Sequence, residues 1–89
     1  MTRVVVFAKP GCARCRQAQK ILRRLGVEFE VLDPEANADN LALYAWCDPT
    51  DHPPRCVLLD TNDKVLASCD GSESVHRFAQ KVLDMGGGV

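Results

Sequence analysis

The alternation of apolar and polar positions along the chain predicts four strands. Residues 3–8 and 56–59 are apolar at nearly every position, which is typical of strands that are buried on both faces and central in their sheet. Residues 27–31 read Val-Glu-Phe-Glu-Val, and this strict alternation predicts a strand with one solvated face, at an edge of the sheet. Turn residues at 60–63 precede a strand of mixed polarity at 64–68, so an antiparallel hairpin ending at an edge is expected there.

Three further segments carry apolar side chains at helical spacing. The first starts at the cysteines of residues 12–15 and ends at Gly26, the second starts near Asn37 or Asp39, and the third opens at residues 71–72. The second ends with Tyr44, Trp46 and Cys47, of which Trp46 is predicted to be a packing residue. The faces predicted to pack carry Cys15, Ala18, Ile21, Leu22 and Leu25 in the first helix, Ala38, Leu41, Ala42 and Ala45 in the second, and Val75, Phe78, Ala79, Val82 and Leu83 in the third.

The order of these elements, β-α-β-α-β-β-α, predicts an α/β fold. The strand, helix and strand within residues 3–31 imply a right-handed parallel crossover. We therefore expect a four-stranded mixed sheet of order 2-1-3-4 with helices on both faces. The 89 residues are enough for one domain with a single modest core, which we assign to residues 1–85, with a flexible tail at 86–89.

Composition and charge exclude several classes of function. The chain has 11 basic and 12 acidic residues and lacks a basic block interleaved with aromatic residues, so nucleic acid is not an expected partner. Its apolar runs are too short for a membrane segment, and a strand is predicted directly after Met1-Thr2, which leaves no room for a signal peptide. The odd number of cysteines, 5, fits a reducing compartment, and we expect a cytoplasmic monomer.

Two of the cysteines, Cys12 and Cys15, are three residues apart at the point where a strand meets a helix. Pro10-Gly11 breaks the first strand, so Cys12 falls at the amino end of the first helix, where unpaired N–H groups and the helix dipole stabilise a thiolate. Lys9, Arg14 and Arg16 add positive charge to the same region. A thiolate there can attack a disulfide, and Cys15 is within reach to resolve the mixed disulfide.

The same pair of cysteines has two other interpretations. A C-x-x-C pair can be half of a structural zinc site, but such sites usually show a second close pair, whereas Cys47, Cys56 and Cys69 are isolated. The two cysteines can also be merely structural. Their placement between a strand and a helix favours redox chemistry, and no metal-ligand set is predicted. Cys56 is expected to be buried as a small apolar residue, and Cys69 to be the more exposed of the two and open to glutathionylation or cross-linking.

From Arg3 to about Leu83 the chain resembles the glutaredoxins of the thioredoxin-like superfamily. Three features carry the resemblance: Lys9 upstream of Cys12-Ala13-Arg14-Cys15, a proline before the third strand, and Cys69-Asp70 after the fourth. Where dithiol glutaredoxins usually have Pro-Tyr between the cysteines, this chain has Ala-Arg. Where they have Thr-Val-Pro it has His52-Pro53-Pro54, and where they have Gly-Gly-Cys-Asp it has Ala67-Ser68-Cys69-Asp70.

The resemblance implies roles for these residues. Cys12 would be the nucleophile, Cys15 the resolving thiol and Pro54 a cis-proline that faces them. His52 is a candidate proton carrier, since its unperturbed pKa is near 6.5, although a loop histidine is more often only solvated. The residues expected to bind substrate or glutathione are Lys9, Arg14, His52, Pro53, Pro54, Cys69 and Asp70.

The expected function is therefore that of a thiol-disulfide oxidoreductase. It would reduce protein disulfides or glutathione-mixed disulfides, without a bound cofactor and with glutathione or a thioredoxin-type reductase as reductant. Two alternatives stay open. One is a carrier of metal or an iron–sulfur cluster that uses Cys12, and the other is a non-catalytic binding module on the same fold.

Overall fold

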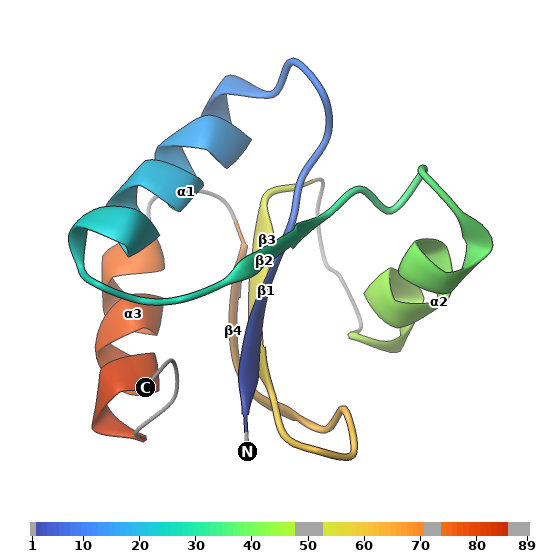
Figure 1. Ribbon diagram of the computed structural model, residues 1–89. Helices are drawn as coiled ribbons and strands as arrows, with labels where there is room; N and C mark the ends of the chain where they lie inside the picture. Colours follow the sequence, from blue (N-terminus) through green and yellow to red (C-terminus); the bar gives the residue numbers. More distant parts are fainter. Residues whose placement is uncertain (1, 48–52, 71–73, 86–89) are drawn as a thin grey trace.

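A computed structural model describes residues 2–47, 53–70 and 74–85. Its centre is a four-stranded sheet of order β2-β1-β3-β4 (Figure 1). β1 pairs with β2 in parallel and with β3 antiparallel, and β3 pairs antiparallel with β4. The elements are β1 (Arg3–Phe7), α1 (Ala13–Arg24), β2 (Glu30–Leu32), α2 (Ala38–Trp46), β3 (Arg55–Leu59), β4 (Val65–Asp70) and α3 (Val75–Asp84). The predicted fold class, element order and strand order are confirmed.

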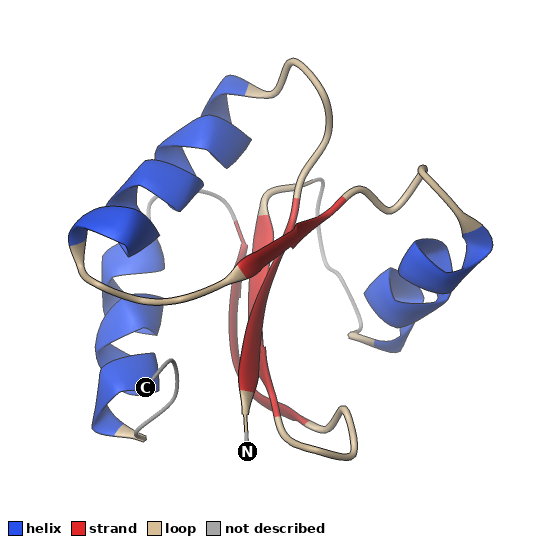
Figure 2. Cartoon of the chain, viewed as in Figure 1, coloured by secondary structure: helices blue, strands red, loops and turns tan. Residues whose placement is uncertain are grey.

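Helices cover both faces of the sheet (Figures 1 and 2). α1 and α3 pack on one face and α2 on the other, so the central strands contribute to two separate cores. Val4 and Val6 of β1 lie in the core under α1 and α3, whereas Val5 and Phe7 lie in the core under α2. Alternate side chains of a strand point to opposite faces, which is why a strand covered on both sides is apolar throughout.

The two helices on the first face bury the residues that their periodicity predicts, except at their carboxyl ends. Cys15, Ala18 and Leu22 of α1 are buried, as are Val75, Phe78, Ala79 and Val82 of α3. Gly26, with φ +77°, follows the C-cap residue of α1, because glycine adopts this left-handed conformation at little cost. Leu25 and Leu83, at the carboxyl ends of their helices, were predicted to pack but are 38% and 41% exposed.

The predicted packing face of α2 is wrong. No residue of this helix is buried, and Leu41, expected to face inward, is 54% exposed. Leu43 and Tyr44 make the contacts with the sheet instead, and the Tyr44 ring meets Phe7 edge-on with centroids 5.1 Å apart. The start of the helix agrees with the prediction, since the Asn37 side chain accepts the N–H of Asn40.

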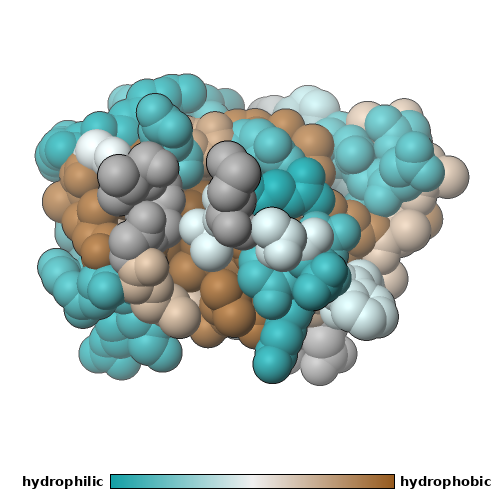
Figure 3. All heavy atoms as spheres, turned by 60° about the horizontal axis from the view of Figure 1, so that its bottom comes forward, coloured by the Kyte–Doolittle hydropathy of each residue, from teal (hydrophilic) through white to brown (hydrophobic). Residues whose placement is uncertain are grey.

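Two further expectations are corrected. β2 is only three residues long, and Val31, whose alternation with glutamate predicted an inward side chain, is 45% exposed. Val27 and Phe29 do pack in the core under α1, but before the strand begins. Trp46 is 62% exposed and not a core residue. Apolar residues are visible among polar ones on the face of the molecule in Figure 3.

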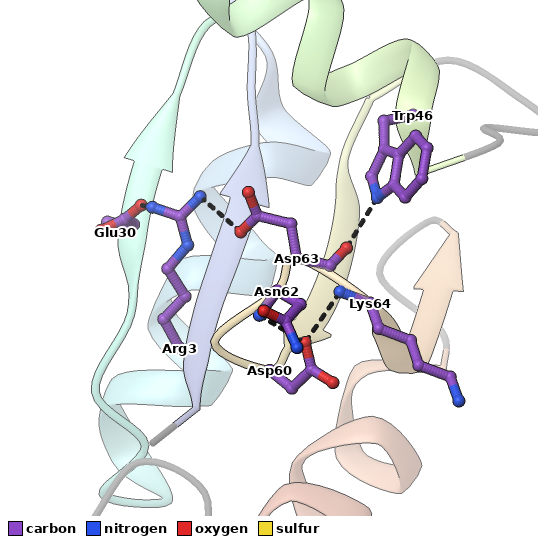
Figure 4. Close-up of polar contacts among 7 residues, drawn as sticks. All are labelled: Arg3, Glu30, Trp46, Asp60, Asn62, Asp63 and Lys64. Atoms are coloured by element: carbon purple, nitrogen blue, oxygen red, sulfur yellow. Dashed lines mark hydrogen bonds and ion pairs between the residues drawn. The ribbon is translucent and has the colours of Figure 1, made fainter.

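The β3–β4 turn is held by side-chain hydrogen bonds (Figure 4). The Asp60 carboxylate accepts the backbone N–H groups of Asn62 and Lys64, at 2.8 and 3.0 Å. The indole N–H of Trp46 donates to the carbonyl oxygen of Asp63 at 2.6 Å, which ties the end of α2 to the turn. This contact, and not packing, is the role that the structure gives Trp46.

Three sequence expectations fall on residues outside the described ranges: the role of His52 in its loop, the start of the third helix at residues 71–72, and the flexible tail at 86–89. Among the described residues, no helix is long and apolar enough to cross a membrane.

Candidate active site

Cys12 is the N-cap residue of α1. Its backbone is extended, with φ −88° and ψ 110°, and its Sγ accepts the N–H of Cys15 at 3.2 Å. The preceding Gly11 has φ +73°, a conformation that lets the chain turn sharply between β1 and the helix. The turn at Pro10-Gly11 therefore places the Cys12 sulfur next to the free N–H groups of the first turn of α1.

The two thiols of this pair have opposite pKa shifts. The hydrogen bond from the Cys15 thiol, backbone N–H groups of Cys15 and Arg14, and the charge of Arg16 together hold the pKa of Cys12 below its ordinary value, although partial burial opposes them. Burial, followed by the hydrogen bond to Cys12, raises the pKa of Cys15 to about 11. Cys12 is half-buried, whereas Cys15 is 1% exposed. Cys12 is therefore the more acidic and more accessible thiol of the pair, and Cys15 is buried behind it.

Pro53 lies beside Cys12 although 41 residues separate them in the chain. The Cys12 thiol donates to the carbonyl oxygen of Pro53 across 4.0 Å. The peptide bond between Pro53 and Pro54 is cis, and Pro54 is fully buried at the start of β3. The amino end of α1 and the segment entering β3 thus form two sides of one site.

The basic residues near the cysteines contribute unequally. Arg16 lowers the pKa of Cys12 through its charge, whereas Arg14 does so through its backbone N–H group. Lys9 accepts the N–H of Cys12 with its carbonyl oxygen at 3.4 Å, and its side chain is exposed. Arg14 is also exposed, so the side chains of Lys9 and Arg14 are free to meet a ligand rather than fixed in the site.

Cys69 and Asp70 are neighbours in β4 that point to opposite faces of the sheet. Cys69 is 8% exposed and Cys56 is 0% exposed, so Cys69 is the more exposed of the two, as expected, although both belong to the core under α1 and α3. Asp70 lies on the side of α2, where a carboxylate oxygen is 2.8 Å from the Arg55 guanidinium. The structure thus brings Lys9, Cys12, Cys15, Pro53 and Pro54 together, while the Asp70 carboxylate is engaged on the other face.

Sequence reasoning missed Arg55. Its side chain is buried, pairs with Asp70 and donates to the carbonyl oxygen of Cys47 at 2.7 Å. Arg55 thereby joins β3, β4 and the end of α2. The signal was present in the sequence, because an arginine directly before the apolar run 56–59 must find a partner when the strand is central.

No group of three or more histidine, cysteine, aspartate or glutamate side chains is placed to hold a metal ion within the described residues. All five cysteines are free thiols. The arrangement is suited to thiol chemistry, in which Cys12 has the sulfur of lowered pKa and Cys15 is close enough to act as a resolving thiol.

Comparison with known proteins agrees with this chemistry. The glutaredoxin family model matches residues 4–45. A glutaredoxin from Vernicia fordii is 31% identical over 78 residues, which cover 83% of this chain and 71% of that protein. The crystal structure of a wheat glutaredoxin is similar with TM-score 0.56 and 26% identity, over 90% of this chain and 74% of that one. Thioredoxin NaTrxh from Nicotiana alata shares the fold, with TM-score 0.66 and 22% identity over 93% of this chain and 71% of its own. The chain belongs to the glutaredoxin family of thiol-disulfide oxidoreductases.

Proposed function

We propose that this protein reduces protein disulfides and glutathione-mixed disulfides, with Cys12 as the nucleophile and Cys15 as the resolving thiol. The observation that carries the proposal is the geometry at the amino end of α1, where Cys12 is the N-cap and its Sγ accepts the N–H of Cys15 at 3.2 Å, and the opposite pKa shifts of the two thiols agree with it. A lowered pKa gives Cys12 a larger fraction of thiolate than an ordinary cysteine has at the same pH. Cys12 is half-buried, so a substrate can reach its sulfur, whereas Cys15 is buried and a substrate cannot reach it directly.

The reaction proceeds by two exchanges. The Cys12 thiolate attacks one sulfur of the substrate disulfide, so that a bond forms to Cys12 and the other substrate sulfur leaves as a thiolate. Cys15 then loses its proton to the leaving thiolate or to water and attacks Sγ of Cys12. This second step forms the Cys12–Cys15 disulfide and releases the substrate's remaining thiol, so two electrons have passed from the protein to the substrate.

The substrate would dock between α1 and the segment of Pro53 and Pro54. The Pro53 carbonyl oxygen, next to Cys12, is a backbone acceptor for a peptide-like substrate. The exposed side chains of Lys9 and Arg14 offer positive charge to the carboxylates of glutathione. Glutathione, or a thioredoxin-type reductase, would return the Cys12–Cys15 disulfide to the dithiol, and the cycle needs no bound cofactor. Five free cysteines fit action in a reducing compartment such as the cytoplasm, and we propose that the protein acts there as a monomer.

The test is the turnover of a glutathione-mixed disulfide by the wild type and by two single variants. Cys12→Ser should abolish exchange, because the attacking sulfur is gone. Cys15→Ser should instead accumulate a mixed disulfide on Cys12 when a protein disulfide is offered, which mass spectrometry detects. Equal loss in both variants without a trapped intermediate, or a mixed disulfide on another cysteine, would contradict the assignment.

The same assay separates the two reductants. Turnover is measured once with glutathione and glutathione reductase, and once with thioredoxin reductase, each with reduced nicotinamide nucleotide in excess. Turnover with only one system identifies the electron donor. Absence of turnover with both, in a folded wild type that also fails to reduce a protein disulfide, would favour a binding module over an enzyme.

A further inference from the structure

Cys56 of β3 and Cys69 of β4 lie directly opposite each other. They are register partners in the antiparallel pair, and both belong to the core that also contains Cys15. Opposite residues of an antiparallel pair have Cα atoms about 4.5–5.5 Å apart. A disulfide accommodates Cα separations of about 4.4–6.8 Å, so the backbone already has the spacing that a cross-strand disulfide requires.

The two thiols are not equivalent. A hydrogen bond between them, with burial, raises the pKa of Cys56, whereas the same bond and the N–H group of Cys56 lower the pKa of Cys69. Burial opposes the lowering at Cys69, and the pKa of Cys69 is still held below its ordinary value while that of Cys56 is raised. This is the division between an attacking thiol and a resolving thiol.

Cys69 is also the thiol of this pair that a small molecule can approach. It lines a cavity of about 210 Å³ between β4 and α3, together with Ser68, Ser74, Arg77, Phe78 and Lys81. Among the charged groups, Arg55 lowers the pKa of Cys69 and Asp70 raises it. One water molecule takes up about 30 Å³ of liquid, so a molecule with two oxygen atoms fits the cavity. Cys56, at 0% exposed, lies behind Cys69.

We propose that Cys56 and Cys69 are a second redox pair, separate from Cys12 and Cys15, which hydrogen peroxide oxidises to a cross-strand disulfide. The Cys69 sulfur attacks one oxygen of the peroxide, the O–O bond breaks, and Cys69 becomes a sulfenic acid while water is released. The Cys56 sulfur then attacks Sγ of Cys69, forms the S–S bond and expels the hydroxyl group as a second water. One peroxide is reduced and two thiols are oxidised, so atoms and electrons balance.

Cys47 provides a matched control inside the same chain. It is 2% exposed, it also lines a cavity, of about 520 Å³, and burial raises its pKa. It lies in the core under α2, whereas Cys56 and Cys69 lie in the other core. Peroxide should therefore oxidise Cys69 several-fold faster than Cys47 in the folded protein.

Tryptic mapping after limited peroxide treatment and alkylation tests this directly. Cleavage after Arg24, Arg55, Lys64 and Arg77 places Cys47, Cys56 and Cys69 on three separate peptides, residues 25–55, 56–64 and 65–77. We expect peptides 56–64 and 65–77 to be joined by a disulfide that dithiothreitol reverses. In Cys56→Ala, Cys69 should instead accumulate as a sulfenic acid that dimedone traps, whereas Cys47→Ala should behave as the wild type.

Two results would overturn the proposal. One is oxidation of Cys69 in the folded wild type that is no faster than oxidation of Cys47. The other is a disulfide that joins Cys69 to Cys12, to Cys15 or to a second chain in place of Cys56. Because the wild type is mapped without any substitution, the result does not depend on how the variants fold. It is also read on different peptides from Cys12 and Cys15, so it stands apart from the outcome for the proposed disulfide reduction.

Discussion

The reactivity of Cys12 depends on named neighbours whose removal should have unequal effects. The hydrogen bond from the Cys15 thiol is the largest cause of the lowered pKa, and the charge of Arg16 is a smaller one. Cys15→Ala should therefore raise the pKa of Cys12 more than Arg16→Gln does. The pH dependence of iodoacetamide alkylation of Cys12 measures both pKa values. If the pKa of Cys12 rises more in Arg16→Gln than in Cys15→Ala, the charge of Arg16, and not the hydrogen bond from the Cys15 thiol, is the main cause of the lowered pKa.

Pro53 should limit the use of glutathione. The residue before the buried proline offers its carbonyl oxygen near Cys12 but, as a proline, has no N–H to donate. A missing hydrogen bond of this kind costs about 1 kcal/mol, which weakens binding several-fold. Pro53→Val restores the donor and keeps the apolar bulk, so we expect a lower KM for a glutathione-mixed disulfide. An unchanged KM in a folded variant would show that Pro53 does not pair with the ligand's backbone.

Individual site residues were predictable from the sequence where their signal is local. Cys12 and Cys15 follow from their spacing and from Pro10-Gly11, all within one turn and the start of one helix. Cys69 and Asp70 were identified as a unit, but adjacent residues of a strand point to opposite faces. Only the register of β3 against β4 shows that Cys69 meets Cys56 while Asp70 meets Arg55. Long-range pairing of this kind has no signature in a single sequence.

The three helices differ in how well the sequence predicts which of their faces packs against the sheet. α1 and α3 alternate charged and apolar residues, so their buried faces follow from the helical period. α2 is apolar on nearly all sides, and its period does not distinguish Leu41, which is exposed, from Leu43 and Tyr44, which pack. Its orientation is set by the edge-to-face contact with Phe7 and by the bond of Trp46 to the β3–β4 turn. Both are tertiary contacts.

The ion pair between β3 and β4 should stabilise the hairpin. Arg55 and Asp70 have side-chain exposures of 7% and 26%, whereas the surface pair Arg3 and Glu30 has 44% and 46%. Asp70→Asn leaves a buried guanidinium without its counter-charge, so we expect the free energy of unfolding to fall by about 2 kcal/mol. Glu30→Gln, the matched control, should cost less than about 1 kcal/mol. Urea unfolding of both variants measures the difference, and equal costs would contradict a structural role for the buried pair.

The molecule as a whole distributes its cysteines over two cores. Cys15, Cys56 and Cys69 lie in the core under α1 and α3, and Cys47 lies in the core under α2. This division follows from the sheet's two-sided cover, which the continuously apolar strands β1 and β3 predicted. The fold class could thus be predicted because it depends on periodicity, whereas the contacts among the cysteines depend on how the elements meet.

The stability of the reduced protein should fall as the pH rises above about 9. Burial raises the pKa of Cys15 from the ordinary 9.0 to about 11 and also raises the pKa of Cys47, and the hydrogen bond with Cys69, followed by burial, raises the pKa of Cys56. Between pH 9.0 and about 11 the Cys15 thiol of the unfolded chain releases a proton that the folded chain retains, so this thiol lowers the free energy of unfolding by about 1.4 kcal/mol per pH unit, and the other raised thiols act in the same direction. Cys12 and Cys69, whose pKa values are lowered, add stability as the pH rises toward 9.0, and this contribution is complete above it.

Urea midpoints under reducing conditions, at about pH 8 and about pH 10, measure this dependence. Cys47 has a raised pKa and lies in the core under α2, apart from Cys15, Cys56 and Cys69. The urea midpoint of Cys47→Ala should therefore fall less between the two pH values than the midpoint of the wild type. Lys64→Gln, a substitution at an exposed side chain, should leave the wild-type slope unchanged and serves as the control. A wild-type midpoint that is independent of pH over this range would show that the buried thiols ionise as readily in the folded protein as in the unfolded chain.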